Sequence, residues 1–182
     1  HAPSLEDGVV DTVMRGGDTD TNAAICGALL GAVHGLDAVP QRHPFRFIDE
    51  IRELDEEHCV GVYRFREDEY FYRGHFPDLP LTPGVILIET MAQTGVVAFG
   101  IYLTMKQMNI TAGQTKGITT LFTIAENVEF LKIVKPGEQV VVYGEKIYFR
   151  KGSLKSRIRM ETPEGEVICH GILAGTGARL EQ

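Results

Sequence analysis

The chain has 182 residues, of which 43% are hydrophobic and 24% are charged, and this composition is typical of a globular protein with a buried core. The 20 glycines and 8 prolines are too few for a fibrous or low-complexity chain, and the formal net charge of −7 argues against a nucleic-acid-binding protein. No signal-peptide pattern precedes residue 8. Three cysteines without metal-binding spacing (Cys26, Cys59 and Cys169) indicate a reducing compartment, so we expect a cytoplasmic protein without a disulfide framework or a structural zinc site.

Charge is distributed unevenly along the chain. Residues 1–40 contain six acids and a single base, Arg15, whereas residues 130–160 contain eight bases and two acids, a local net charge of +6. A basic stretch in an acidic protein is compatible with an acidic partner, but it is equally compatible with ordinary solvated strand faces.

The first predicted element is a helix over residues 22–34, which is rich in small residues, begins at Asp, Thr and Asn capping residues and ends at Gly35. Short β-like runs begin after Pro40, as in Phe45–Ile51 and Cys59–Arg66. We therefore place a boundary near Val39–Arg42, with an N-terminal appendage over 1–39 and the main domain over 40–182.

Residues 79–105 form the longest apolar segment, with Glu89 as its only charged residue. A membrane-spanning helix needs about 20 apolar residues, and polar residues interrupt the first half of this segment. Pro83 and Gly84 indicate a helix entrance, after which apolar residues occupy nearly every face. The pattern predicts a central helix that is buried on all sides, and no membrane span.

The rest of the chain alternates with a period of two, most clearly over 154–160, and turn residues separate the runs at 135–138, 150–153 and 163–165. These are predicted antiparallel strands, half-buried against the helix. The predicted fold class is α+β, with an antiparallel sheet wrapped around a long central helix.

Glu89 is the first candidate for chemistry. An ionised carboxylate in an apolar helix costs several kcal/mol, or the group takes up a proton and can act as a general acid. The alternative is a glutamate paired with an arginine or placed at the edge of the helix. Gln93 lies one turn further on the same face, where it can orient Glu89 or serve as a helix-to-helix hydrogen bond.

His75 lies 14 residues before Glu89, in a turn bounded by Gly74 and Pro77 that can hold an imidazole as a base. The predicted helix entrance supplies the backbone N–H groups of Gly84 and Val85, which can polarise a carbonyl oxygen. A base, an acid and an oxyanion donor together can remove a proton next to a carbonyl group and expel a β-hydroxyl.

The motifs GHFPDLPLTPGVILIETMAQ (residues 74–93) and FLKIVKPGEQV (residues 130–140), with Pro44, Phe45 and Asp49, resemble the β-hydroxyacyl-acyl-carrier-protein dehydratases of fatty acid synthesis. The resemblance covers roughly residues 40–177. It implies the hotdog fold, catalytic roles for His75 and Glu89, and no cofactor. An isomerising branch of the family carries aspartate at the glutamate position, so Glu89 favours the non-isomerising dehydratases. Thr82 and Thr90 occupy positions often held by Met and Ala.

The resemblance also implies assembly and a partner. Family dimers place the histidine of one subunit against the carboxylate of the other, and three dimers commonly form a hexamer. The implied partner is an acyl carrier protein, which carries the substrate as a phosphopantetheine thioester. Because carrier proteins are acidic, Arg150, Lys151 and Lys155 in the basic stretch are candidates for binding it.

Residues 8–37 resemble a second family, the ADP-ribosylglycohydrolases, whose Gly-Asp-x-Asp-Thr motif supplies magnesium ligands. The corresponding residues here are Asp18, Asp20 and Thr21. They provide fewer oxygen ligands than a hard cation takes, because the helical body that supplies the others is absent. We therefore expect no bound metal and interpret this segment as a fused fragment.

Two other functions remain open from the sequence: thioester hydrolysis on the same fold, in which an acidic residue activates water, and a non-catalytic module that binds acyl thioesters. Retention of both His75 and Glu89 favours dehydration, since binding alone needs no buried acid. His170, in the last predicted strand, is expected to be an ordinary packed or edge histidine.

Overall fold

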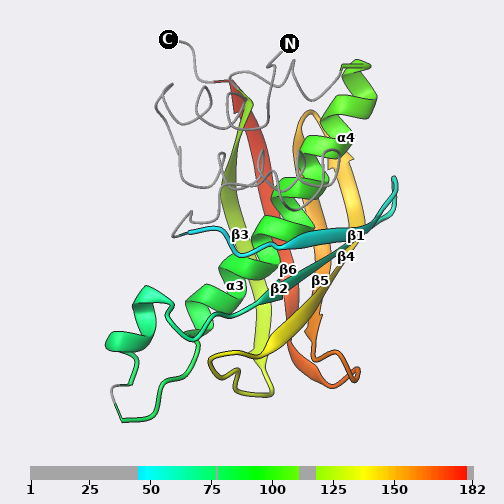
Figure 1. Ribbon diagram of the computed structural model, residues 1–182. Coiled ribbons are helices and arrows are strands. Elements are labelled where there is room, and N and C mark those ends of the chain that lie inside the picture. Colours follow the sequence, from blue (N-terminus) through cyan, green and yellow to red (C-terminus); the bar gives the residue numbers. More distant parts are fainter. Residues whose placement is uncertain (1–44, 77, 111–117, 180–182) are drawn as a thin grey trace, which may run out of the picture.

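The computed structural model describes residues 45–76, 78–110 and 118–179 (Figure 1). The predicted helix over 22–34, the proposed boundary at Val39–Arg42 and the weak metal candidates Asp18, Asp20 and Thr21 lie outside these described residues. Structural statements below concern the described part of the chain.

The described residues form one sheet around one helix. The strands are β1 (Glu50–Leu54), β2 (His58–Arg64), β3 (Ile118–Phe130), β4 (Gln139–Arg150), β5 (Ser153–Glu161) and β6 (Val167–Arg179). They follow the order β1-β2-β4-β5-β6-β3, and neighbouring strands are antiparallel. The central helix runs without a break through α3 (Gly84–Ala92), a π-helical segment η3 (Gln93–Ala98) and α4 (Phe99–Met108). A short 3-10 helix, η2 (Tyr70–Arg73), precedes it.

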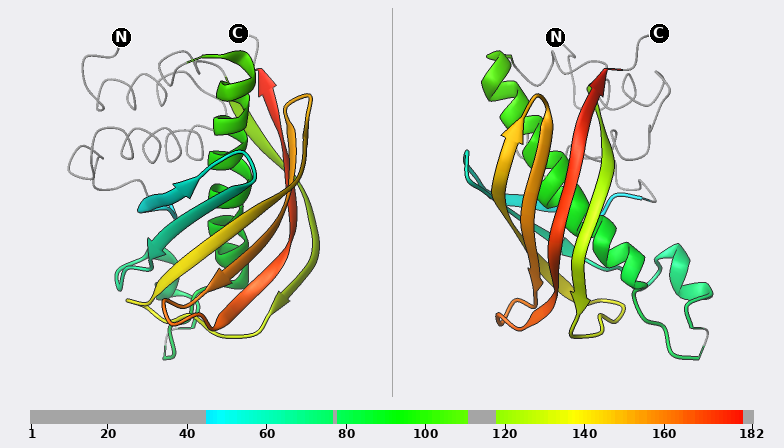
Figure 2. Two further views of the ribbon diagram at one scale, coloured as in Figure 1. Left: turned by 90° about the vertical axis from the view of Figure 1, so that its right-hand side faces the viewer. Right: turned by 180° about the vertical axis from the view of Figure 1, so that it is seen from behind.

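The sheet curves around the central helix, as the two views of Figure 2 show. This arrangement confirms the predicted α+β class and the hotdog architecture. The helix is long and apolar enough to cross a membrane by length and composition, but 72% of its most apolar stretch is buried inside the protein. Its apolar residues therefore form the core of the domain, which is the usual reason for such a composition in a helix covered by a sheet.

Strand β5 shows how the alternating pattern produces the sheet. Leu154, Ser156, Ile158 and Met160 are buried on the inner face, and the basic side chains between them point outward. The turn before β5 contains Lys151 and Gly152, both with positive φ (50° and 76°), as a two-residue hairpin of this type requires. The predicted turns at 135–138, 150–153 and 163–165 are all confirmed.

One expectation about the strands is wrong, and one strand was not expected. Strand β1 begins at Glu50 and not at Phe45, because the Gln93 side chain binds the Phe45 carbonyl oxygen and the Phe47 N–H group. Strand β3 has no counterpart in the prediction. It lies at the edge of the sheet with Leu121, Phe122 and other apolar side chains exposed, so its sequence lacks a clear inner and outer face.

The expectation that the helix is buried on every side holds from Thr90 to Phe99 but is wrong in its first turns and in α4, where Tyr102 and Met105 are only partly buried. Val85 is 71% exposed, and Ile88 and Glu89 are only partly buried. The sheet covers the middle of the helix and leaves one side of its N-terminal end open.

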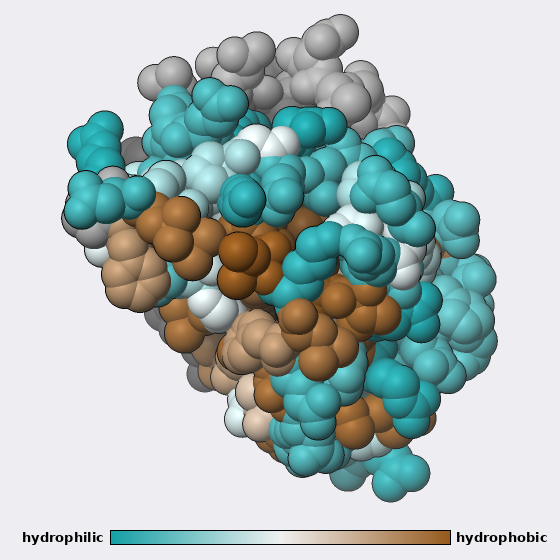
Figure 3. Space-filling view, turned by 90° about the horizontal axis from the view of Figure 1, so that it is seen from below, coloured by the Kyte–Doolittle hydropathy of each residue, from teal (hydrophilic) through white to brown (hydrophobic). Residues whose placement is uncertain are grey.

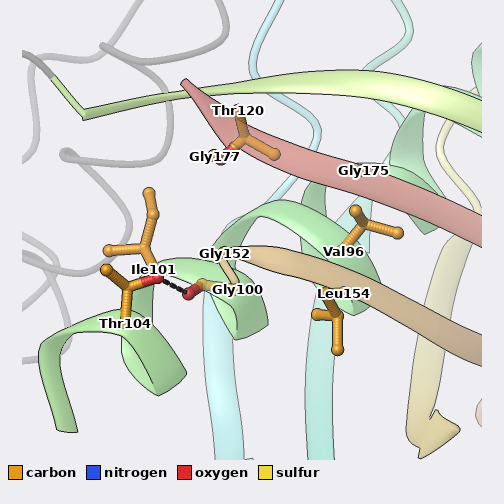
Figure 4. Close-up of a pocket in the computed structure, with 9 residues that line it drawn as sticks. All are labelled: Val96, Gly100, Ile101, Thr104, Thr120, Gly152, Leu154, Gly175 and Gly177. Carbon is orange, nitrogen blue, oxygen red and sulfur yellow. Dashed lines mark hydrogen bonds between the residues drawn. The ribbon is translucent and has the colours of Figure 1, made fainter. Parts of the chain in front are cut away.

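Two glycines allow the helix to approach the sheet closely. A β-carbon added at Gly95 would lie 2.5 Å from Cδ1 of Ile158, and one added at Gly144 would lie 2.9 Å from Cα of Gly95. Gly100, one turn and a half further along, differs: an added β-carbon would make ordinary contact with Leu154 at 3.7 Å. Figure 4 shows Gly100 beside a hollow between α4 and the ends of β3, β5 and β6.

These contacts predict opposite effects for two identical substitutions. Gly95→Ala should lower the free energy of unfolding by about 1–3 kcal/mol, because the methyl group overpacks the core. Gly100→Ala should raise it by about 0.5–1 kcal/mol, because alanine favours the helix and the hollow accepts a methyl group. Urea denaturation of both variants checks this. Equal effects of the two substitutions would contradict the close approach at Gly95.

Candidate active site

The turn that contains His75 is held by backbone hydrogen bonds. The N–H groups of Gly74 and His75 both donate to the Phe71 carbonyl oxygen, at 3.2 and 3.1 Å, and the Leu81 N–H donates to the His75 carbonyl oxygen at 3.0 Å. The ring is oriented by a further bond, since Nδ1 of His75 lies 3.1 Å from the Leu81 carbonyl oxygen. A carbonyl oxygen only accepts, so Nδ1 carries the hydrogen in the neutral ring and Nε2 has the lone pair that can take up a proton.

Glu89 and Gln93 lie one turn apart on the central helix, and the structure brings them together. Nε2 of Gln93 donates to Oε1 of Glu89 at 2.8 Å and to the Phe45 carbonyl oxygen at 2.8 Å. Oε1 of Gln93 accepts the Phe47 N–H at 2.8 Å. The Gln93 side chain is fully buried, and these three bonds fix its amide group so that the NH₂ end faces Glu89. Because Oε1 of Glu89 accepts this bond, the hydrogen of a protonated Glu89 carboxyl group is expected on Oε2.

The helix entrance lies directly after this turn in the chain. The Pro83 carbonyl oxygen accepts the N–H groups of Ile86 and Leu87, at 2.9 and 3.1 Å. Within the described residues, no backbone carbonyl oxygen accepts the N–H of Gly84 or Val85, as is normal for the first residues of a helix. The Phe130 ring packs against Gly84, where an added β-carbon would lie 3.1 Å from the ring. The absence of a side chain at Gly84 therefore lets the Phe130 ring pack directly against the first residue of the helix.

Large apolar side chains are exposed around the entrance. They belong to the His75 turn, the first turn of α3, the end of β3 and the segment that follows it: Phe76, Leu79, Val85, Phe130, Leu131 and Ile133. Figure 3, which views the molecule from the end where these segments lie in Figure 1, shows several apolar areas. Exposed apolar surface of this kind is typical of a site of binding or association.

The structure does not bring the carrier-binding candidates to this end of the molecule. Arg150 and Lys151 lie in the β4–β5 turn, which in Figure 1 is close to the C-terminal end of α4, whereas η2 and the start of α3 lie at the opposite end. Lys155 is bonded to Glu126 at 2.8 Å and is largely covered. Other bases of the +6 stretch are also paired, among them Lys146 with Glu57 and Arg157 with Glu145. The stretch is thus not one continuous basic surface.

Several groups at the site carry no signal in the sequence. The carbonyl oxygens of Phe45 and Leu81 and the N–H of Phe47 act through the backbone, which any residue could supply. Tyr70 is a further neighbour: burial and the nearby carboxylates of Glu69 and Glu89 raise the pKa of its hydroxyl. His170, as expected, lies on the outer strand surface, 3.7 Å from Glu129.

Comparison with known proteins identifies the class of protein that this fold and site define. Residues 39–172 match the FabA-like domain family, and the chain belongs to that family. Two relatives described as 3-hydroxyacyl-[acyl-carrier-protein] dehydratase FabZ are each 37% identical to it. The protein from Caldicellulosiruptor bescii aligns over 139 residues, which is 76% of this chain and 91% of its own length. The protein from Anoxybacillus flavithermus aligns over 132 residues, 72% of this chain and 85% of its own.

A solved structure supports the same fold. The dehydratase heterocomplex ApeI:P from Xenorhabdus doucetiae contains a chain that matches with a TM-score of 0.60 at 14% sequence identity. The match covers 76% of this chain and 87% of that one. At this identity the likeness concerns the fold alone.

Residues 1–68 also match the ADP-ribosylglycohydrolase family, and the two family matches overlap. The described part of the second match, residues 45–68, contains β1 and β2. Strand β2 pairs with β4 through seven residue pairs, from His58 with Glu145 to Arg64 with Gln139. Strands β1 and β2, which lie within the second match, are therefore an integral part of the hotdog sheet.

Proposed function

We propose that this protein dehydrates 3-hydroxyacyl-acyl-carrier-protein thioesters to trans-2-enoyl thioesters in fatty acid biosynthesis, and is thus a hydro-lyase. The observation that supports this most directly is 37% identity to dehydratases over most of their length, in a chain whose His75 and Glu89 are each held in a defined orientation. The proposal needs no cofactor, since the reaction removes water without oxidation or reduction.

In the proposed reaction, Nε2 of His75 takes the proton from the α-carbon of the thioester. The N–H groups at Gly84 and Val85 stabilise the negative charge that develops on the thioester oxygen. Oε2 of Glu89 gives its proton to the β-hydroxyl group, which leaves as water while the α–β double bond forms. The proton on His75 then passes to Glu89, directly or through solvent, and both groups return to their starting states. Gln93 keeps Oε1 of Glu89 occupied and so directs the proton to Oε2.

Purified protein tests this proposal directly. Incubation with a 3-hydroxyacyl pantetheine thioester should produce the conjugated enoyl thioester, followed by its absorbance, with the thioester bond intact. Release of free thiol would instead show a thioesterase, the main alternative on this fold. Binding of the thioester without either product would show a non-catalytic module.

We propose that the working form is a homodimer in which each site takes His75 from one subunit and Glu89 from the other, and that three dimers can associate. The exposed apolar side chains around Val85 and the exposed edge of β3 support association. The domain division also remains a proposal: an appendage over 1–39 and a hotdog domain over 40–182. A cytoplasmic setting is supported by Cys59 and Cys169, which are both buried free thiols.

Arg150 and Lys151 remain proposed contacts for an acidic carrier protein, whereas Lys155 is already neutralised by Glu126. We expect Arg150→Glu or Lys151→Glu to raise KM for a carrier-bound substrate by about threefold at low salt, and less at high salt. A pantetheine thioester should be unaffected. Arg52→Glu, an equal charge change on β1, is the matched control. Equal KM changes for both substrates, or for the control, would remove these residues from the carrier surface.

A further inference from the structure

The buried hydroxyl groups of Tyr72 and Thr82 contact each other at the two ends of the segment that contains His75. The Tyr72 hydroxyl lies 2.7 Å from Oγ1 of Thr82, and the two residues are only 7% and 6% exposed. Burial raises the pKa of Tyr72 to about 12, so its hydroxyl stays neutral near neutral pH. The contact is therefore a hydrogen bond between two neutral, buried hydroxyls.

We propose that Tyr72 and Thr82 are positioning residues for His75. They lie at the two ends of the segment 72–82, which contains both His75 and the Leu81 carbonyl oxygen that accepts the His75 ring N–H. Their bond closes this segment into a loop. The inference rests on the proposed function for its catalytic consequence, but its structural consequence for the His75 ring can be measured independently.

The surroundings show why the ends of the loop control its shape. Between the two ends, Gly74, Phe76 and Leu79 are exposed, so backbone hydrogen bonds and not side-chain packing hold the middle of the loop. The ends are anchored: the Thr82 N–H donates to the Val134 carbonyl oxygen at 2.8 Å, and the Tyr72 N–H donates to the Glu69 carbonyl oxygen at 3.1 Å. Because Thr82 directly follows Leu81, any shift of Thr82 moves the carbonyl oxygen that orients His75.

The hydrogen bond between the two hydroxyls constrains the ends of the loop more than an apolar contact would, because each buried hydroxyl needs its partner. Removing one hydroxyl leaves the other buried without its partner, which favours a rearrangement of the loop that exposes it to water. Such a rearrangement separates the ends of the loop and weakens the bond from Nδ1 of His75 to Leu81. The imidazole then loses its preference for the Nδ1–H form, and Nε2 is no longer aimed at the substrate.

The test uses Tyr72→Phe and Thr82→Val, which remove one hydroxyl each with little change in shape, together with the double variant. Each single variant should lower kcat about tenfold with KM within about twofold, because a small displacement of a reacting group costs rate more than binding. The double variant should be no worse than either single one, since the two hydroxyls act as a pair. Thr82→Ser, which keeps the hydroxyl, should restore most of the activity.

A second readout separates positioning from stability. The ¹⁵N chemical shifts of the His75 ring should show the Nδ1–H tautomer in the unaltered protein and in Thr82→Ser, and a mixture of tautomers in Tyr72→Phe and Thr82→Val. Thr104→Val is the matched control, because Oγ1 of Thr104 donates to the Gly100 carbonyl oxygen at 2.8 Å at the far end of the helix. It should change neither kcat nor the tautomer.

Wild-type kcat together with a wild-type tautomer in Tyr72→Phe and Thr82→Val would overturn the proposal. So would a loss of activity that follows only the folded fraction of each variant, with the His75 tautomer unchanged. If the unaltered protein fails to dehydrate the thioester, the proposed function fails, but the ring nitrogen shifts still decide whether this pair orients His75.

Discussion

Glu89→Gln and His75→Ala are each expected to lower kcat for dehydration of a 3-hydroxyacyl thioester by about 10²–10⁴, the range for a positioned acid or base. Glutamine at position 89 keeps the size of the side chain and can still accept the hydrogen bond from Gln93, but it has no proton to give to the leaving hydroxyl. Alanine at position 75 removes the imidazole ring whose Nδ1 is bonded to the Leu81 carbonyl oxygen. KM should change much less than kcat in both variants.

Two control variants make this result specific. His170→Ala removes a histidine on the outer face of the sheet, and Glu145→Gln neutralises an exposed carboxylate on β4. Both should retain wild-type kcat and unfold within about 0.5 kcal/mol of the wild type, as surface changes usually do. Turnover near the wild-type value in either Glu89→Gln or His75→Ala would refute the assignment of that residue.

The elements that could be predicted from the sequence are those in which local pattern and tertiary environment agree. Strand β5 alternates because one of its faces meets the helix, and the β4–β5 turn has glycine where the backbone needs positive φ. The central helix was recognisable because the sheet covers it, and a helix covered in this way can be apolar on most faces. Glu89 stood out against that background for the same reason.

The features that could not be predicted depend on contacts between distant parts of the chain. The Gln93 side chain replaces strand pairing for Phe45 and Phe47, which lie more than 40 residues earlier. Lys155 appears in the sequence as one of a run of bases, yet its partner Glu126 lies on β3, 29 residues earlier in the chain and separated from it by the whole of β4. Most described side chains of β3 are exposed, with Thr120 buried and Val128 packed against the core, so its apolar residues show no periodicity that distinguishes an inner side.

The exposed apolar surface leads to the last prediction, which concerns how a complete site is assembled. Val85 is 71% exposed in the turn before Glu89, and Phe130 and Ile133 are exposed beside the helix entrance. While this surface is exposed, water can reach Glu89 and compete for its proton. A second subunit that covers the surface would exclude that water. If that subunit also provides the histidine, each complete site contains His75 from one chain and Glu89 from the other.

Mixing two inactive variants then restores activity. A dimer of one His75→Ala subunit and one Glu89→Gln subunit has one site that lacks both groups and one site that has both. Random exchange of equal amounts should make about half of the dimers mixed, so about one quarter of all sites should be intact. Activity should rise towards about 25% of the wild-type value after the subunits are dissociated and reassembled together, whereas each variant reassembled alone should stay inactive. Verified mixed dimers without recovered activity would place His75 and Glu89 of one site in the same chain.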